Sequence, residues 1–129
     1  MRRWLILLAL AGCADSAPPP SITGSVPPPP PSRFDGSYRG TATRVFGTDF
    51  NCGRPSNALT MVIAQGRAVG RLPGQDEGRG TVAASGSLTL RGNLDASQRA
   101  EGRISDSFEF TASFQSRFCR WDMRLNREG

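Results

Sequence analysis

Apolar and polar residues alternate along much of the chain after Arg33, and this period of two restricts the segment to β-strands. The clearest example is the stretch 108–115, which reads Phe-Glu-Phe-Thr-Ala-Ser-Phe-Gln. Successive side chains of a strand point to opposite faces, so such a segment has one apolar face and one polar face. No window of twelve residues shows the 3.6-residue period of an amphipathic helix. We therefore expect an all-β domain.

The alternation also predicts which side chains face the core. On the opening strand the apolar residues recur four positions apart, and elsewhere they recur every second position. Glu109 alternates with phenylalanine and is expected to face solvent. The predicted inward residues are Phe34, Tyr38, Ala42, Phe46, Leu59, Met61, Ile63, Leu88, Leu90, Phe108, Phe110, Ala112, Phe114, Cys119, Trp121, Met123 and Leu125.

Turn signals such as Gln65-Gly66, Pro73-Gly74 and Ser85-Gly86 punctuate this pattern at short, even intervals. These signals predict an antiparallel meander of eight strands. A meander of that size can close into a small barrel with its last strand beside its first. A two-sheet sandwich is the alternative. Glycines within the strands indicate a strongly bent sheet. The expected strands are 34–46, 57–65, 67–72, 79–84, 87–92, 100–105, 107–116 and 118–127.

The N-terminus carries an export signal. Two arginines follow Met1, and an apolar run of eight residues covers 4–11. This run is too short to span a bilayer as a helix, which takes about 20 apolar residues, but it suits a secretory signal. It ends in Leu10-Ala11-Gly12-Cys13, which resembles the lipobox of bacterial lipoproteins. The resemblance implies cleavage before Cys13 and lipid attachment to it; a plain secretory signal with a chance cysteine is the alternative.

A lipid anchor on Cys13 implies a protein held on a membrane of the cell envelope. Ala14, and not an aspartate, follows the cysteine. By the sorting rule of enterobacterial lipoproteins, this favours the outer membrane, with the domain facing the periplasm. The inner membrane and the cell surface are alternative locations. The first expected partner is the membrane itself, which the protein would bind through the lipid on Cys13.

Composition divides the chain into three parts: a signal peptide over 1–12, a lipidated cysteine with a proline-rich tether over 13–32, and a β domain over 33–129. Eight of the ten prolines lie between Pro18 and Pro31. Polyproline is extended at about 3.1 Å per residue, so 18–32 can reach roughly 45 Å. A proline-rich ligand for another domain is the alternative function of this segment.

Two cysteines remain once Cys13 is assigned to lipid. Cys52 and Cys119 would lie in an oxidising compartment, where a disulfide between them is expected. The bond would join the long loop 47–56 to the start of the last strand. A metal pair or a reactive thiol is the alternative, but the chain offers no histidine to complete either site.

The residue inventory argues against an enzyme. The chain has no histidine and no lysine, so histidine-based triads and lysine nucleophiles are excluded. The carboxylates are scattered, and Asp76-Glu77 lacks the ligand spacing of a known calcium loop. Gly78-Arg79-Gly80-Thr81-Val82-Ala83 matches a dinucleotide-binding pattern but not its strand–helix context. We expect no catalytic residue, no metal and no cofactor.

The net charge of +5 comes from arginine alone. Without Arg2 and Arg3, 14 arginines face 11 acidic residues, and no block of like charges occurs. The arginines are interpreted as a solvated surface that permits contact with anionic lipid or envelope polymers; an anion-binding patch is the alternative. Nucleic acid is not an expected partner, given this modest charge and the exported location.

Two classes of function remain. The first is an interaction module that binds an envelope protein or polymer through the loop 47–56, with Phe50 and Arg54 as candidate contacts. The second is a structural envelope component without a discrete ligand, for which this loop merely crosses the barrel end. A small-molecule barrel is a further alternative. The layout also resembles small periplasmic barrels that inhibit secreted proteases, a likeness of fold alone.

Overall fold

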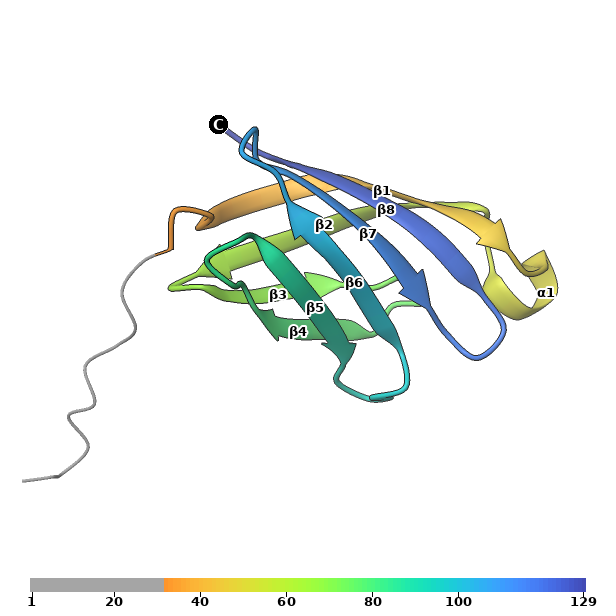
Figure 1. Cartoon of the computed structure of the whole chain (residues 1–129). Coiled ribbons are helices and arrows are strands. Elements are labelled where there is room, and N and C mark those ends of the chain that lie inside the picture. The colour runs from red at the N-terminus through yellow and green to blue at the C-terminus, as the bar shows by residue number, and fades with distance from the viewer. Residues whose placement is uncertain (1–31) are drawn as a thin grey trace, which may run out of the picture.

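A computed structural model describes residues 32–129 of the chain. The predicted signal peptide 1–12, the lipidation site Cys13 and the proline-rich tether up to residue 31 lie outside the described residues. The β domain expected from 33 onward lies within them (Figure 1).

All eight predicted strands are present, with bounds shifted by no more than three residues at either end. Only one short helix, α1 (Asp49–Cys52), interrupts them in the described part of the chain. The strands are β1 (Gly36–Phe46), β2 (Ser56–Ala64), β3 (Arg67–Arg71), β4 (Glu77–Thr81), β5 (Ser87–Gly92), β6 (Arg99–Ile104), β7 (Glu109–Gln115) and β8 (Arg120–Arg127).

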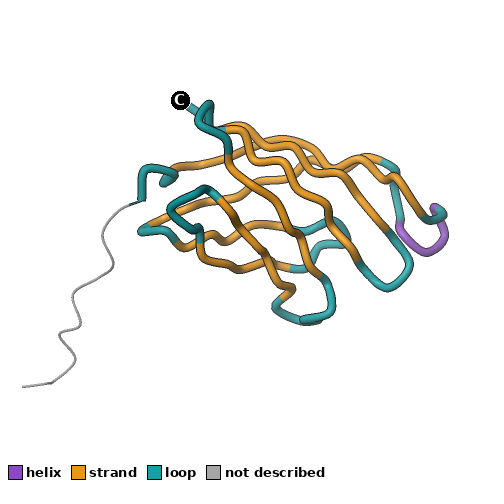
Figure 2. The backbone as a smooth tube through the Cα atoms, in the orientation of Figure 1, coloured by secondary structure: helices purple, strands orange, loops and turns teal. Residues whose placement is uncertain are grey.

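The strands pair in chain order and close into an antiparallel barrel (Figures 1 and 2). Closure joins β1 to β8 from Tyr38–Arg127 to Phe46–Arg120. The predicted barrel is therefore confirmed, and the alternative of a sandwich is wrong. The glycines within strands bring neighbouring backbones together: a Cβ on Gly40 would overlap the Arg124 carbonyl oxygen. This close approach fits the strong bending expected of the sheet.

The barrel interior is filled by side chains, as the alternation predicted. Apolar residues from every strand except β4 are buried in one core. An eight-stranded barrel is just wide enough for side chains to fill it. The largest fully buried side chains are Trp121, Tyr38, Phe34, Phe110, Phe114, Leu59, Leu72, Leu88, Leu90, Ile104 and Leu125.

The prediction that Phe46 faces the core is wrong. Its side chain is 69% exposed, although it shares its four-residue spacing with the buried Ala42. The register between β1 and β8 shifts between Arg44 and Phe46, so that Phe46 pairs with the outward-facing Arg120. A β-bulge adds one residue to a strand and reverses the facing of those beyond it.

Phe108 was expected within a strand, but it precedes β7 and has a positive φ of 60°. Its ring is only partly buried and packs on the core edge-on to Phe34, with ring centroids 6.4 Å apart. The Arg127 guanidinium lies 3.4 Å from its centroid. Phe108 thus covers the end of the barrel instead of lining its interior.

The barrel has two distinct ends (Figure 2). The N-terminal end holds residues 32–35, the β2–β3, β4–β5 and β6–β7 turns, and the C-terminus. Here the Tyr38 hydroxyl donates a hydrogen bond of 2.7 Å to the Phe34 carbonyl oxygen. The opposite end, called the disulfide end below, holds the loop 47–55, α1 and the β3–β4, β5–β6 and β7–β8 connections.

Candidate functional site

The candidate loop contains a short capped helix that the alternation pattern did not predict. Thr48 has extended backbone angles, and its hydroxyl accepts a hydrogen bond from the Asn51 amide at 3.4 Å. Gly53 ends α1 with φ 75° and donates its amide to the Asp49 carbonyl. A threonine N-cap and a glycine end signal are recognisable in the sequence, but a single turn of helix is too short to produce an amphipathic period.

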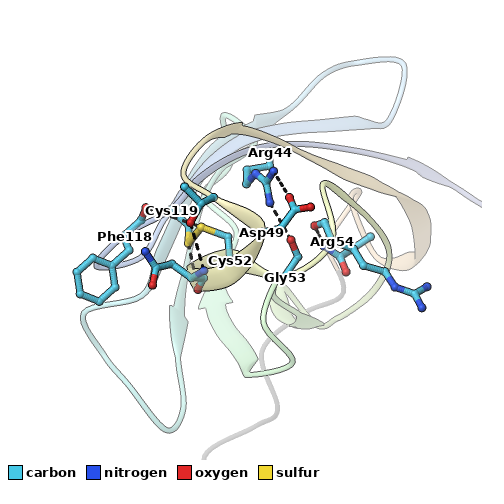
Figure 3. The surroundings of a disulfide bond; sticks show 10 residues. Arg44, Asp49, Cys52, Gly53, Arg54, Phe118 and Cys119 are labelled. Carbon is cyan, nitrogen blue, oxygen red and sulfur yellow. Dashed lines mark hydrogen bonds and ion pairs between the residues drawn. A yellow bond between two sulfur atoms is a disulfide. The ribbon is translucent and has the colours of Figure 1, made fainter.

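Arg44 holds the loop against β1. Its side chain is only 14% exposed; one guanidinium nitrogen forms an ion pair with Asp49, and another donates 2.7 Å to the Gly53 carbonyl oxygen (Figure 3). The backbone amide of Arg44 also donates to the Pro55 carbonyl. One residue therefore fixes the first, middle and last parts of the loop.

The Cys52–Cys119 disulfide joins α1 to the residue just before β8, as predicted (Figure 3). The space beside it is tight: a Cβ on Gly47 would overlap the Cys52 sulfur and lie 2.9 Å from the Phe118 carbonyl oxygen. Gly47 also has a φ of +112°, which side chains rarely adopt. The disulfide therefore joins this loop to the β7–β8 connection, and the loop also packs tightly against that connection at Gly47.

Phe50 lies on this fixed helix with 96% of its side chain exposed. Arg54 is also exposed, one residue after the helix cap, and Figure 3 shows its side chain directed away from the disulfide. The structure thus places both sequence-predicted contacts on the surface of one restrained loop. Large aromatic side chains are, on average, mostly buried in proteins. An aromatic ring that is almost fully exposed on a rigid element is therefore unusual.

Two further exposed aromatic residues lie beside the disulfide. Phe46 and Phe118 line a small groove of about 180 Å³ together with Arg117 and Arg120. Phe118 is 54% exposed, and the Arg117 guanidinium lies 5.2 Å from its ring centroid. Phe46, Phe118, Arg117 and Arg120 around this groove, and Phe50 and Arg54 on the loop, are all exposed at the disulfide end of the barrel; we call these six residues together the aromatic–arginine surface.

Sequence reasoning missed part of this surface for identifiable reasons. Phe46 was assigned to the core because the bulge in β1 leaves no mark in the alternation. Phe118 precedes the predicted disulfide cysteine, and that position was the available signal that it would lie beside the loop 47–56.

The acidic pair at the junction of the β3–β4 turn and β4 serves the fold. Asp76 is buried, and its carboxylate accepts backbone hydrogen bonds from Glu77 at 2.8 Å, from Leu94 at 3.2 Å and from Asp95 at 3.3 Å. Glu77 forms an ion pair with Arg79 on the outer wall. Asp76 thereby ties the β3–β4 turn to the β5–β6 loop. Gly78 and Gly80 of the glycine-rich motif lie within strand β4.

Within residues 32–129, no three histidine, cysteine or acidic side chains come together in a group that could hold a metal ion. The described part also contains no helix of the length and apolar character needed to cross a membrane. Compared with protein families, curated proteins and solved structures, the chain matches no family, no curated protein and no solved structure.

Proposed function

We propose that this protein is a lipid-anchored component of the bacterial cell envelope whose barrel is a protein-interaction module. The single observation that supports this most is Phe50, an aromatic ring 96% exposed on a loop fixed by a disulfide and by Arg44. A rigid loop loses little conformational entropy on binding. Phenylalanine and arginine are also enriched at protein interfaces.

The composition of the surface supports a protein partner. Three exposed phenylalanines and three exposed arginines lie at this end of the barrel, and the groove between Phe46 and Phe118 could receive an apolar side chain. Binding energy at interfaces concentrates in a few aromatic and arginine anchors near the centre. We assign the anchoring role to Phe50 and the role of a charged rim contact to Arg54.

The packed interior favours this function over a small-molecule barrel. Trp121, Tyr38, Phe110 and Phe114 fill the space that a ligand would need. Ligand sites are typically concave and bury most of the ligand. The groove beside the disulfide is instead small, about 180 Å³, and is lined mostly by exposed residues.

The proposed anchor is compatible with the position of the surface. The described chain begins at the N-terminal end of the barrel, and α1 lies at the opposite end (Figure 1). A lipid on Cys13, followed by the proline-rich segment, would therefore leave the aromatic–arginine surface directed away from the anchoring membrane.

Lipidation is tested with the full-length chain and a Cys13→Ser variant. We expect radiolabelled palmitate to enter the wild-type protein, which should fractionate with membranes, and the variant to lose both properties. Equal labelling of the two proteins would show that Cys13 is not the attachment site. A labelled protein found only in the inner membrane would contradict the outer-membrane location that Ala14 favours.

The partner surface is tested by placing a photo-reactive amino acid at position 50 in cells. A matched control carries it at Val62, which is also exposed but lies on the barrel wall. We expect a discrete crosslinked protein from position 50 whose yield falls when Arg54 becomes alanine. No crosslink from position 50, or the same products from both positions, would contradict an interaction module at this end.

A further inference from the structure

The strand register brings together arginines that are distant in the sequence. Arg79 of β4 pairs directly with Arg91 of β5, and Arg91 pairs directly with Arg99 of β6. All three side chains are exposed on the outer wall of the barrel. We call these three residues the arginine row. Each arginine of the row therefore lies directly opposite the next one on the adjacent strand. The linear sequence does not show this alignment, because the three residues are 8 to 12 positions apart.

The geometry makes this row a line of positive charge. Neighbouring strands lie about 4.8 Å apart, so the three side chains leave the sheet within roughly 10 Å of one another. Like charges directly opposite each other destabilise a sheet. Three such positions in succession therefore act against folding unless another interaction offsets them.

Acidic side chains neutralise only the two outer arginines of the row. Glu77 forms an ion pair with Arg79 at 3.2 Å, and Glu101 forms one with Arg99 at 3.1 Å. Between residues 32 and 129, Arg91 has no acidic side chain within ion-pair distance. The four strands β3 to β6 carry six arginines and these two glutamates. The other two acids of this segment lie in its loops: Asp76 is buried, and Asp95 accepts hydrogen bonds from Ser97.

The row continues beyond β6. Arg99 pairs with Gln115 of β7, Gln115 with Arg120 of β8, and Arg120 with Phe46 of β1. A line of donors thus runs across five strands on an open surface. The ligand that matches this line is an extended chain of hydrogen-bond acceptors that lies across the strands. A small ion matches it poorly, because the open outer face of the barrel cannot enclose the ion.

We propose that the arginine row binds a linear polymer, other than a nucleic acid, that carries a phosphate group in each repeat. Guanidinium groups match phosphate oxygens through paired hydrogen bonds. The outer face of β3 to β6 has no aromatic side chain on which nucleic-acid bases could stack. The exposed large apolar residues here are Val69 on this face and Leu94 in the adjoining β5–β6 loop, and two aliphatic side chains are too few to anchor the wall in a lipid surface. This site is separate from the aromatic–arginine surface, apart from Arg120 at its edge, and does not depend on it.

The test uses the full-length protein in detergent and long-chain inorganic polyphosphate as the probe. The decisive variant is Arg91→Glu, which places a carboxylate between two guanidinium groups. We expect it to bind polyphosphate at least about tenfold more weakly and to lower the slope of log affinity against log salt by about one or more. We also expect its melting temperature to rise, so that lost binding cannot be attributed to unfolding.

The matched control is Arg39→Glu, which makes the same charge change at an exposed position of β1 outside the row. It should bind nearly as wild type. Equal losses in both variants would show that only net charge matters and would overturn the proposal. Equally tight Arg91-dependent binding of single-stranded DNA would overturn the exclusion of nucleic acid, and equally tight binding of vesicles rich in phosphatidylglycerol would overturn the assignment to a polymer.

Discussion

At the N-terminal end of the barrel, phenylalanine and arginine are packed together; at the disulfide end, the same residue types are exposed. Phe34 is 1% exposed and lies edge-on to Phe108, while Arg33 and Arg127 lie over their rings. Phe50, in contrast, projects from α1 into solvent.

The comparison shows that a barrel of this size can cover its end with aromatic side chains. At the disulfide end a covalent bond fixes the crossing loop, and the ion pair of Arg44 with Asp49 adds to it. The phenylalanines there are not needed to cover the core, which makes their exposure meaningful. Exposed apolar side chains that gather in a patch typically mark a contact site, and Phe46 and Phe118 line one groove at this end.

The largest expected effect separates the two ends directly. Phe34→Ala should lower the free energy of unfolding by about 3–5 kcal/mol, because it removes a buried ring and leaves a cavity. Phe50→Ala should change it by no more than about 0.5 kcal/mol. Urea denaturation followed by tryptophan fluorescence measures both. A strongly destabilised Phe50→Ala variant would mean that this ring has a structural role after all.

Removal of the disulfide tests what fixes the other end. Replacing both Cys52 and Cys119 with serine should cost about 4 kcal/mol, the chain-entropy value for a loop of this length. Crosslinking from position 50 should also weaken under conditions where the variant stays folded. Equal urea midpoints for the wild-type protein with and without reductant would contradict this stabilising role.

Tyr38 gives the N-terminal end a distinctive pH dependence. Burial raises the pKa of this phenol above its ordinary value, with Asp35 adding to the shift and Arg127 opposing it. The unfolded chain therefore loses this proton first, and stability should fall as the pH rises above about 10. The chain has no lysine, no histidine and no other tyrosine, and Cys52 and Cys119 are bonded. Within residues 32–129, Tyr38 is therefore the side chain whose type titrates near pH 10.

Tyr38→Phe should remove this alkaline loss of stability. It should also cost about 1 kcal/mol at neutral pH, because the Phe34 carbonyl loses its hydrogen bond. Denaturation curves at pH 8 and pH 11 measure both effects. An unchanged slope with pH in the variant would show that another group is responsible.

The smallest effect concerns the cap of α1. Thr48→Ala removes the hydroxyl that accepts from the Asn51 amide, and it should cost about 0.5 kcal/mol. Hydrogen exchange of the amides in 49–53 should accelerate, while amides of β2 keep their protection. Unchanged exchange in the loop would mean that Arg44 and the disulfide suffice to hold it.

Much of the fold could be predicted because a period of two determines which face of each strand is buried. It predicted Phe110, Phe114, Trp121 and Leu125 correctly, and the short turns predicted the order of the strands. The pattern failed where the backbone departs from a regular strand: at the bulge before Phe46 and at the left-handed Phe108.

Less of the candidate site could be predicted, because its members depend on register and on contacts between loops. Phe50 and Arg54 were identified from the loop sequence, and Cys52 and Cys119 from the cysteine count. The alignment of Arg79 with Arg91 and Arg99 was not, since pairing across strands is fixed by turn geometry that composition does not show. These arginines were interpreted as a scattered, solvated surface.

Closure of the sheet between β1 and β8 has a consequence for the order of events in folding. Until β8 is available, β1 and β7 each expose an unpaired edge, and exposed edges are templates for aggregation. Cys119 lies immediately before β8, so the partner of Cys52 reaches its place together with the closing strand. Oxidation of this pair therefore holds the start of the closing strand beside the loop that follows β1, and a chain cut before Cys119 would be an open sheet in which Cys52 lacks its disulfide partner.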